Sequence, residues 1–339
     1  MSQTANQILE ALLNRKDIGE DSAYNLMTKL AEGVVAPPLA GALLTALRLK
    51  GESAEEVRGF ARAMRDVAIP VSLDPGQATI DIVGTGGDGS NSFNLSTGTA
   101  LLSAAAGLQV AKHGNRSVSS KSGSADVLEA LGITLAADAA AVIDLLNKHN
   151  FAFLFAPFFH PAMKNIAPIR QALGIRTVFN ILGPLTNPAQ PTHYLLGAFS
   201  SEMAKLMAGA LSGMNIERAF VIHGCNGWDE PTPICPFEIY DVTANNIQFT
   251  TRDPQEFGIP KCSGEDLRGG TAEHNAKSLL NVFENKDQGA HRDALMLGTA
   301  LALELTGAAT GIEQGVQQAK ETIETGTAAE FIRNLMQPD

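Results

Sequence analysis

The sequence predicts an α/β fold in which a small N-terminal helical domain precedes a large α/β domain with a mostly parallel central sheet flanked by helices. Residues 1–70 carry only apolar stripes at helical spacing. Residues 71–339 alternate short apolar runs with helical stretches, as βα units do. The length of 339 residues fits about two domains.

The N-terminal domain is expected to be a small helical bundle. Apolar residues at helical spacing mark its first helices, at residues 8–13, 24–31 and 39–47. Ser53 and Glu56 form a capping box that opens a further helix. Short helices with such rich apolar stripes either pack on the rest of the chain or form a subunit interface, so a homodimer through residues 1–70 is one of two open alternatives. A later segment near residues 165–190 is expected to pack with this domain.

The second domain begins after residues 70–77, whose prolines and glycine are typical of a linker. The predicted parallel strands are residues 79–83, 108–111, 151–156, 194–199 and 219–222. Helical stretches between them are residues 97–106, 124–131 and 139–149. Residues 237–242 alternate like an edge strand or a hairpin, and residues 272–336 return to helices.

Charge and composition exclude several classes of protein. The formal net charge is −11, which argues against nucleic acid or a membrane as a partner. The longest dense apolar run, residues 151–159, contains Pro157 and is too short to cross a bilayer. The cysteines Cys225, Cys235 and Cys262 have neither zinc-site nor disulfide-framework spacing. We therefore expect reduced thiols in a cytoplasmic protein.

Two loops rich in hydrogen-bond donors follow the first two predicted strands. The first, residues 84–90, is glycine-rich and precedes a helix, so its backbone N–H groups and the helix N-terminus suit phosphate oxygens. The alternative for this loop is a tight turn with an N-cap at Ser96 or Thr97. The second, residues 112–124, combines Lys112, Arg116 and Lys121 with several hydroxyls. It suits a phosphosugar or polyphosphate, although a solvated basic loop is the alternative.

These loops converge where open α/β sheets bind their ligands, at the carboxyl ends of neighbouring strands. A phosphorylated ligand of this kind usually carries Mg²⁺, which prefers carboxylate ligands. Asp229 and Glu230 are the best pair for it, with Asp88 as a helper. On local grounds a solvated turn explains the adjacent acids equally well.

In combination, these motifs resemble the signatures of the anthranilate phosphoribosyltransferase family. The resemblance runs in order along the whole chain and rests on residues 84–88, 94–97, 112–116, 123–126, 170–188 and 229–230. It implies a homodimer through the helical domain. It also implies the second step of tryptophan biosynthesis, which transfers the phosphoribosyl group of 5-phosphoribosyl-1-pyrophosphate (PRPP) to the amine of anthranilate.

The resemblance also implies roles for particular residues. PRPP would be held by Gly84, Gly87, Asp88, Ser92, Asn94, Leu95, Ser96, Thr97, Lys112, His113, Gly114, Asn115, Arg116, Ser117, Val118, Ser119, Ser120 and Ser124. Anthranilate would be bound or guided by Gly84, His113, Asn115, His160, Arg170 and Pro184. Mg²⁺, with two ions per subunit, would be held by Ser96, Asp229 and Glu230. No catalytic nucleophile is implied, because positioning and charge stabilisation suffice.

One feature departs from the family pattern, and two other functions remain open. The acidic pair follows Trp228 and precedes Pro231 and Pro233, which would stiffen its loop. A pyrimidine-nucleoside phosphorylase has a similar fold but would use inorganic phosphate and would not need the acidic pair. A non-catalytic nucleic-acid-binding relative would need a basic groove, which the net charge disfavours. The acidic pair and residues 170–188 favour the transferase.

Overall fold

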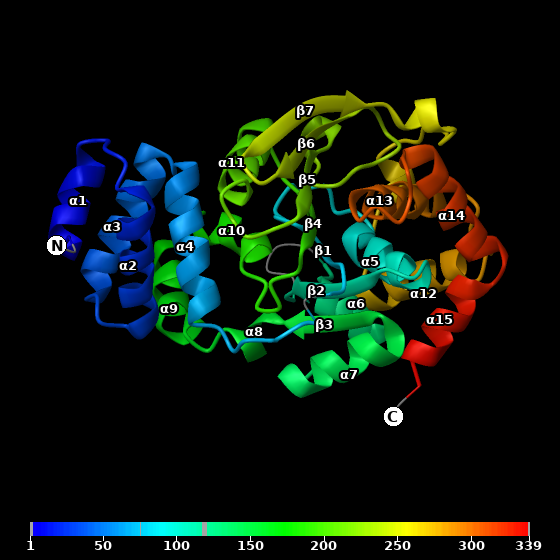
Figure 1. Ribbon diagram of the computed structural model, residues 1–339, viewed down its shortest axis with the longest axis horizontal. Coiled ribbons are helices and arrows are strands. Elements are labelled where there is room, and N and C mark those ends of the chain that lie inside the picture. The colour runs from blue at the N-terminus through cyan, green and yellow to red at the C-terminus, as the bar shows by residue number, and fades with distance from the viewer. Residues whose placement is uncertain (1–2, 75, 117–120, 338–339) are drawn as a thin grey trace.

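The computed structural model describes residues 3–74, 76–116 and 121–337. A bundle of helices lies on the left of Figure 1, and an open sheet with its covering helices lies on the right. The predicted combination of a small helical domain with a larger α/β part is confirmed. Among the described helices, none combines the length and apolar character that a membrane span needs.

The bundle is built from α1 (Ala5–Leu13), α2 (Gly19–Glu32), α3 (Pro37–Lys50) and α4 (Ala54–Asp66). The capping box at the start of α4 is present, since Ser53 Oγ accepts the N–H of Glu56 and the Glu56 carboxylate accepts the N–H of Ser53. A segment from the middle of the chain, α9 (Met163–Leu173), packs against α2 and α3 (Figure 1). Its Asn165 side chain donates to the carbonyl of Ala31 at 2.7 Å, so the bundle draws on two distant parts of the sequence.

The sheet has the strand order β3-β2-β1-β4-β5-β6-β7. Its parallel part is β1 (Thr79–Gly84), β2 (Gln109–Gly114), β3 (Phe151–Phe155), β4 (His193–Gly197) and β5 (Arg218–His223). The antiparallel hairpin of β6 (Phe237–Thr243) and β7 (Asn246–Arg252) closes one edge, as the alternating pattern predicts. The strand order reverses between β1 and β4, and this switch point is where ligands bind in open α/β sheets.

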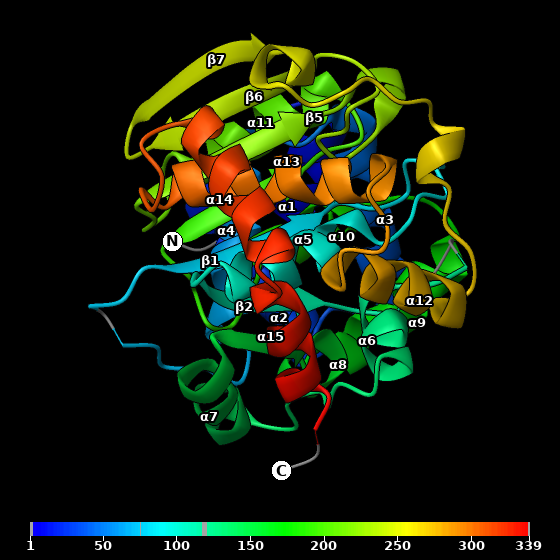
Figure 2. The ribbon, with the colours of Figure 1, turned by 90° about the vertical axis from the view of Figure 1, so that its right-hand side faces the viewer.

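Helices cover both faces of the sheet. The helices after the first strands are α5 (Leu95–Ala105), α6 (Ser124–Ala130), α7 (Ala139–His149), α8 (Ala156–Phe159), α10 (Phe179–Leu182) and α11 (Ser201–Leu211). The C-terminal helices are α12 (Ala272–Phe283), α13 (Ala290–Leu305), α14 (Ile312–Glu324) and α15 (Thr327–Leu335). Figure 2 looks onto the face covered by α12–α15, whereas α11 lies on the other face and contacts α4.

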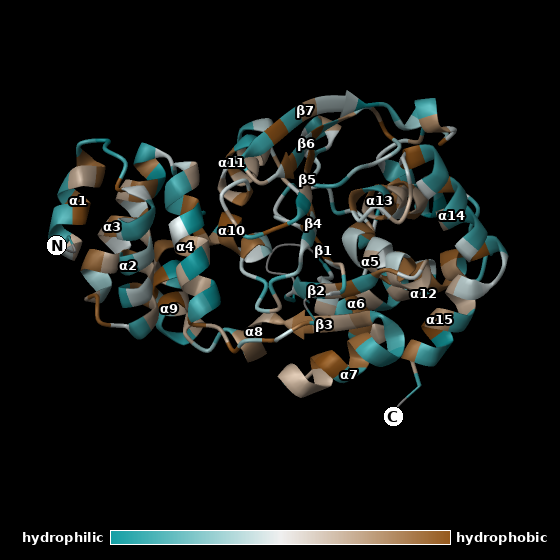
Figure 3. Ribbon diagram, viewed as in Figure 1, coloured by the Kyte–Doolittle hydropathy of each residue, from teal (hydrophilic) through white to brown (hydrophobic). Residues whose placement is uncertain are grey.

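Both faces of the central strands are buried, which explains why these strands read as continuous apolar runs. Leu195 of β4 and Phe220 of β5 pack into the core formed with α5 and α13. Leu196 and Val221, their neighbours in sequence, pack into the core shared with α4 and α11. The helices that cover the sheet carry both hydrophobic and hydrophilic residues along one ribbon, brown and teal in Figure 3. The two layers hold the carboxyl ends of β1, β2 and β4 in fixed positions.

Candidate active site

A cavity of about 640 Å³ lies between the helical bundle and the carboxyl ends of the first strands. Its walls come from α4, the loops after β1 and β2, α8, α9 and the α10 region. It brings together every residue predicted for the acceptor: Gly84, His113, Asn115, His160, Arg170 and Pro184. Residues of the motifs at 84–88, 112–116 and 170–188 therefore meet in one space, although these motifs are spread widely along the chain.

Arg170 is the half-buried cation of this cavity. It lies near the end of α9, and its guanidinium carbon is 5.2 Å from the centre of the Phe179 ring. Burial lowers the pKa of Arg170 from its usual value. No carboxylate among the residues that the structure describes pairs with it. The guanidinium is planar, packs against an aromatic ring and forms no salt bridge with a described residue. It is therefore suited to bind an anionic ligand.

His113 and His160 form a buried pair in the cavity wall, with their Nε2 atoms 3.2 Å apart. His113 Nδ1 lies 3.3 Å from the carbonyl of Gly183, so this nitrogen carries the proton and donates. His113 Nε2 is then the acceptor, and the pair forms a hydrogen bond when His160 carries its proton on Nε2. Burial lowers the pKa of His113 to about 3 and that of His160 to about 4. This wall is therefore neutral at physiological pH.

The glycine-rich loop after β1 needs its glycines for two different reasons. Gly86 and Gly87 have φ values of 70° and 74°, which side chains rarely adopt. At Gly84, by contrast, a Cβ atom would collide with the carboxylate of Asp229. The N–H of Gly86 donates to Asp229 Oδ2 at 2.5 Å. The loop is thus folded around the acidic pair that was predicted to share its site.

Three carboxylates gather here, those of Asp88, Asp229 and Glu230. Burial and the charge of Asp88 raise the pKa of Asp229 to about 7. The pKa of Glu230 is also raised, by its enclosure in the protein and by the charge of Asp229. One carboxylate oxygen of Asp88, Oδ2, is buried and has no hydrogen-bond donor. The cluster has more acceptors than donors, and a cation would complete it.

The residues present fit Mg²⁺, provided that a ligand supplies further oxygens. Among the described residues, no group of three acids, histidines or cysteines is placed to hold a metal by itself. Mg²⁺ usually binds one or two carboxylates and completes its shell with water and substrate phosphate. The unpaired oxygen of Asp88 and the raised pKa values of the other two acids agree with that requirement.

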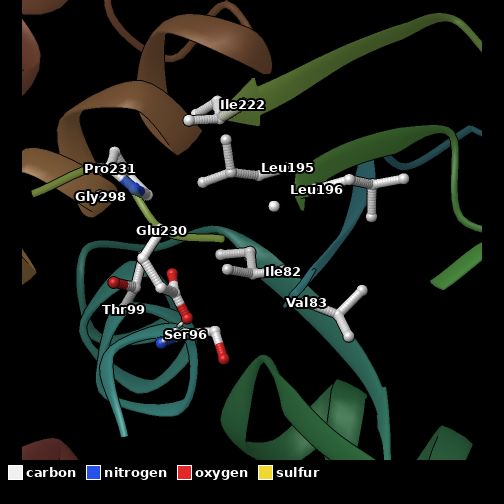
Figure 4. A pocket seen from close by; sticks show the side chains of 11 residues that line it. Ile82, Val83, Ser96, Thr99, Leu195, Leu196, Ile222, Glu230, Pro231 and Gly298 are labelled. Carbon is white, nitrogen blue, oxygen red and sulfur yellow. Dashed lines mark hydrogen bonds between the residues drawn. The ribbon is translucent and has the colours of Figure 1, made fainter. Parts of the chain in front are cut away.

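The alternative of an N-cap at Ser96 or Thr97 is wrong for the start of α5. The helix begins at Leu95, after Asn94, and no side chain caps it. Instead the N–H of Ser96 donates to Glu230 Oε1 at 3.2 Å, and Figure 4 shows the Glu230 side chain directed toward Ser96. A carboxylate from a distant loop therefore takes the place of a local cap, at the positive end of the helix.

Lys112 and Arg116 are both engaged within the protein. Lys112 is fully buried, its Nζ donates to the carbonyl of Ile82, and it does not line the large cavity. Its charge acts on Asp81 and Glu230. Arg116 is exposed and pairs with Asp126 and Glu129 at 2.8 and 2.7 Å.

The other predicted PRPP residues surround the same loops. Thr97 Oγ1 donates to Ser124 Oγ at 3.0 Å, which joins α5 to α6. Asn94 donates to the carbonyl of Ser122 at 3.2 Å. Ser92 forms an isolated bridge with Arg268, while Leu95 is buried and Gly114 ends β2. Ser117, Val118, Ser119 and Ser120 lie outside the residues that the structure describes.

The expectation of reduced cysteines is wrong for two of the three. Cys225 and Cys235 form a disulfide across the loop that carries Asp229 and Glu230, and their Cα atoms are 6.2 Å apart. Cys262 is free. The sequence interval of 10 residues does not reveal this pairing, because only the folded loop brings the two Cα atoms within bonding range.

Among the polar residues that line the cavity, two that could meet a ligand were not singled out from the sequence. Lys164 of α9 and Asn180 of α10 both line the cavity. Asn180 lies within the segment 170–188, so that motif contained a signal for it. Lys164 lies earlier than Arg170 on the same helix, and only the folded arrangement of α9 brings both to one cavity.

An open α/β sheet with a phosphate-type loop at its switch point and a helical bundle closing the cavity defines a two-domain glycosyltransferase. The chain matches the family described as "Glycosyl transferase family, helical bundle domain" over residues 6–68 and "Glycosyl transferase family, a/b domain" over residues 76–329. It is 44% identical to the anthranilate phosphoribosyltransferase of Acetivibrio thermocellus, over 97% of this chain and 95% of the relative.

Solved structures agree with this match. The anthranilate phosphoribosyltransferase of Thermus thermophilus superposes with a TM-score of 0.90 at 40% identity, covering 97% of this chain and 98% of that one. The Saccharomyces cerevisiae enzyme in complex with PRPP and Mg has a TM-score of 0.88 at 27% identity, covering 98% and 96%. The chain belongs to the anthranilate phosphoribosyltransferase family. The phosphorylase and nucleic-acid-binding alternatives are not favoured by these comparisons.

Proposed function

We propose that this chain transfers the phosphoribosyl group of PRPP to the amine of anthranilate, which gives N-(5-phosphoribosyl)anthranilate and pyrophosphate. This is the second step of tryptophan biosynthesis from chorismate, and we expect it in the cytoplasm. Family membership supports the proposal. The single structural observation that carries it is the cavity that Gly84, at the start of the glycine loop, shares with Arg170, which has no carboxylate partner among the described residues.

The donor is proposed to bind at the carboxyl ends of β1 and β2. There the glycine loop presents backbone N–H groups, and the N-terminus of α5 adds a favourable potential for phosphate. Gly87, Asn94 and Thr97 frame this place, and Ser124 closes it from α6. The loops of residues 84–88 and 112–116 thus approach the same ligand from two strands.

Ser96, Asp229 and Glu230, with help from Asp88, are proposed to hold Mg²⁺, with two ions per subunit. When bound, Mg²⁺ offsets the negative charge that grows on the departing pyrophosphate. The protein's own part is to gather these acids, and Lys112 limits their mutual repulsion from within the sheet. Because its pKa is raised, Asp229 would give up any proton that it carries on binding the cation, since a ligating carboxylate is ionised.

The acceptor is proposed to bind through its carboxylate to Arg170. A guanidinium clamps a carboxylate with two parallel hydrogen bonds, which also fixes the direction of the neighbouring amine. The neutral histidine pair and Pro184 provide an uncharged wall for the aromatic ring. The amine is uncharged at neutral pH, so holding it near C1 of the ribose supplies most of what the reaction needs.

We also propose a homodimer formed through the helical bundle. Leu13, Val34 and Leu49 are 58%, 67% and 77% exposed there, far more than a core residue of this bundle such as Met27. Burying such side chains against a second copy removes apolar surface from water. Light scattering should report twice the chain mass of 35.7 kDa, and a monomer at micromolar concentration would contradict the dimer.

The reaction is tested by measuring pyrophosphate. Purified protein with PRPP, Mg²⁺ and anthranilate should release one pyrophosphate for each anthranilate consumed. Thymidine with inorganic phosphate serves as the contrasting reaction, since a nucleoside phosphorylase would release thymine. Phosphorolysis without pyrophosphate release would overturn the proposal.

A further inference from the structure

Arg176 connects three parts of the molecule that are far apart in sequence. It follows α9 and Gly174, and its Nη2 donates to the carbonyl of Gly87 at 2.7 Å. Its guanidinium carbon lies 4.8 Å from the centre of the Phe199 ring, just beyond β4. Its own carbonyl accepts a hydrogen bond from Arg48 Nη1 of α3. The helical bundle, the glycine loop and the end of β4 therefore meet at this residue.

The contact falls on the part of the glycine loop that depends most on outside support. Gly86, Gly87 and Gly89 all have positive φ values, so the loop lacks the rotational restraint of side chains. Hydrogen bonds to distant elements hold it: the Thr85 N–H donates to the carbonyl of Gly197, the Gly86 N–H donates to Asp229, and Arg176 donates to the Gly87 carbonyl. Arg176 thus fixes the loop from the side of the helical bundle.

The guanidinium of Arg176 is exposed and has no acidic partner among the residues that the structure describes. A charged donor to a backbone carbonyl is stronger than a neutral one, and no carboxylate competes for it. The ring of Phe199 restricts the guanidinium further through a cation–π contact. The side chain is therefore held toward the loop, and no salt bridge with a described residue draws it away.

The end of α9 and the turn that follows it contact the sites of both substrates in the proposed function. Arg170 lies in the last turn of α9 and lines the acceptor cavity, whereas Arg176 lies just past its end and holds the donor loop. Only the short turn at Gly174 separates Arg176 from the end of α9, so a displacement of this end relative to α2 and α3 would move both contacts. Two sites that share one element have the physical basis for coupled binding.

We infer that Arg176 is a positioning residue that couples occupation of the donor loop to binding of the acceptor, through α9 and the anchor at Arg48. The inference rests on the proposed function. The coupling should be positive, because a phosphate ligand that orders the glycine loop also fixes Arg176 and hence the end of α9. The acceptor should therefore bind more tightly when the donor loop is occupied.

The test measures anthranilate affinity by calorimetry, with and without magnesium pyrophosphate, which occupies the donor loop without reacting. In the wild type we expect pyrophosphate to tighten anthranilate binding by about fivefold or more. Arg176→Gln should reduce this enhancement to below about twofold. The affinity for anthranilate in the absence of pyrophosphate, and the melting temperature, should stay nearly unchanged. Arg48→Gln, which removes the anchor but keeps the guanidinium at Gly87, should also lower the enhancement. Arg333→Gln, on α15, is the matched control and should retain it.

Several results would overturn the inference. Full enhancement in Arg176→Gln would do so, and so would a loss of pyrophosphate affinity with the enhancement intact, which would make Arg176 an ordinary phosphate ligand. A drop of both affinities together with the melting temperature would show a merely structural contact. A wild type that binds both ligands independently would overturn the coupling and leave the proposed function standing. A wild type that binds neither ligand would overturn both.

Discussion

The backbone N–H of Gly86 donates a hydrogen bond to Asp229 Oδ2 at 2.5 Å, across 143 positions of sequence. This bond joins the loop after β1 to the loop after β5, on either side of the strand β4. The acid that is proposed to hold Mg²⁺ therefore also shapes the loop that is proposed to hold phosphate. Binding of the cation and of the donor should consequently depend on one another.

Neutralising the acidic pair should abolish activity without unfolding the protein. In Asp229→Asn with Glu230→Gln, two mutually repelling acids with raised pKa values become amides of the same shape. We expect the melting temperature to stay within about 4 °C, roughly 1 kcal/mol. Turnover should fall on the order of a hundredfold or more, because metal ions contribute several kcal/mol. A magnesium titration of turnover measures this.

The matched control is Glu256→Gln, an exposed acid far from the cluster in sequence. It should keep both turnover and the magnesium dependence of the wild type. If the double variant retained a wild-type magnesium titration, the pair would have no part in binding the cation.

Changing Arg170→Lys should weaken the acceptor alone. Lysine keeps the charge but loses the planar fork that binds a carboxylate at two points. We expect the apparent affinity for anthranilate to fall about tenfold, or about 1.4 kcal/mol, with the affinity for PRPP nearly unchanged. Steady-state kinetics with each substrate varied in turn measure both values. Arg333→Lys is the control, and equal weakening of both substrates would contradict a role at the acceptor.

The histidine pair should make stability fall in acid. The folded protein lowers the pKa of His113 to about 3 and of His160 to about 4, from an ordinary value of 6.5. The unfolded chain therefore binds more protons below pH 6.5, and stability is lost as pH falls from about 6.5 toward 3. At about pH 5.5 protonation of each histidine in the unfolded chain should lower the unfolding free energy by roughly 1–2 kcal/mol.

Urea unfolding at about pH 7.5 and about pH 5.5 measures this loss. Between these two pH values, the unfolding free energy of the variant that combines His113→Gln with His160→Gln should fall by about 3 kcal/mol less than that of the wild type. Equal losses in the two proteins would show that the pair is not held neutral.

The disulfide between Cys225 and Cys235 predicts an uneven reactivity of the thiols. Alkylation of denatured, unreduced protein should label Cys262 alone, and labelling after reduction should reach all three cysteines. Cys225→Ser with Cys235→Ser should lower the unfolding free energy by about 2–3 kcal/mol, because the unfolded loop is no longer closed. Labelling of all three cysteines before reduction would contradict the disulfide and would support the reduced thiols that the composition suggests.

Local patterns in the sequence predict most of the helices and strands, because these elements depend mainly on interactions between residues that are close in the sequence. The apolar runs at residues 79–83 and 219–222 became β1 and β5, and the capping box at Ser53 opens α4. The edge strand or hairpin at residues 237–242 became β6 with its partner β7. In each case the signal lies within a few residues of the element that it predicts.

The site is predicted less completely because its contacts join distant parts of the chain. Motifs pointed to Arg170 and to the acidic pair, and the structure brings Arg170 to the acceptor cavity. No local pattern shows that Glu230 takes the place of a cap at Ser96, or that Arg176 holds Gly87. The same holds for Lys112, whose amine turns into the sheet toward Ile82 rather than into the cavity. Such pairings are fixed only by the tertiary fold.

The central claim is that one site unites a phosphoribosyl donor, Mg²⁺ and anthranilate. The most direct measurement follows anthranilate fluorescence in a single vessel to which PRPP and Mg²⁺ are added in either order. We expect no change after the first addition and a loss of fluorescence after the second, at a rate proportional to the protein concentration. Fluorescence that stays constant with both present, or that falls equally with either one alone, would contradict the account.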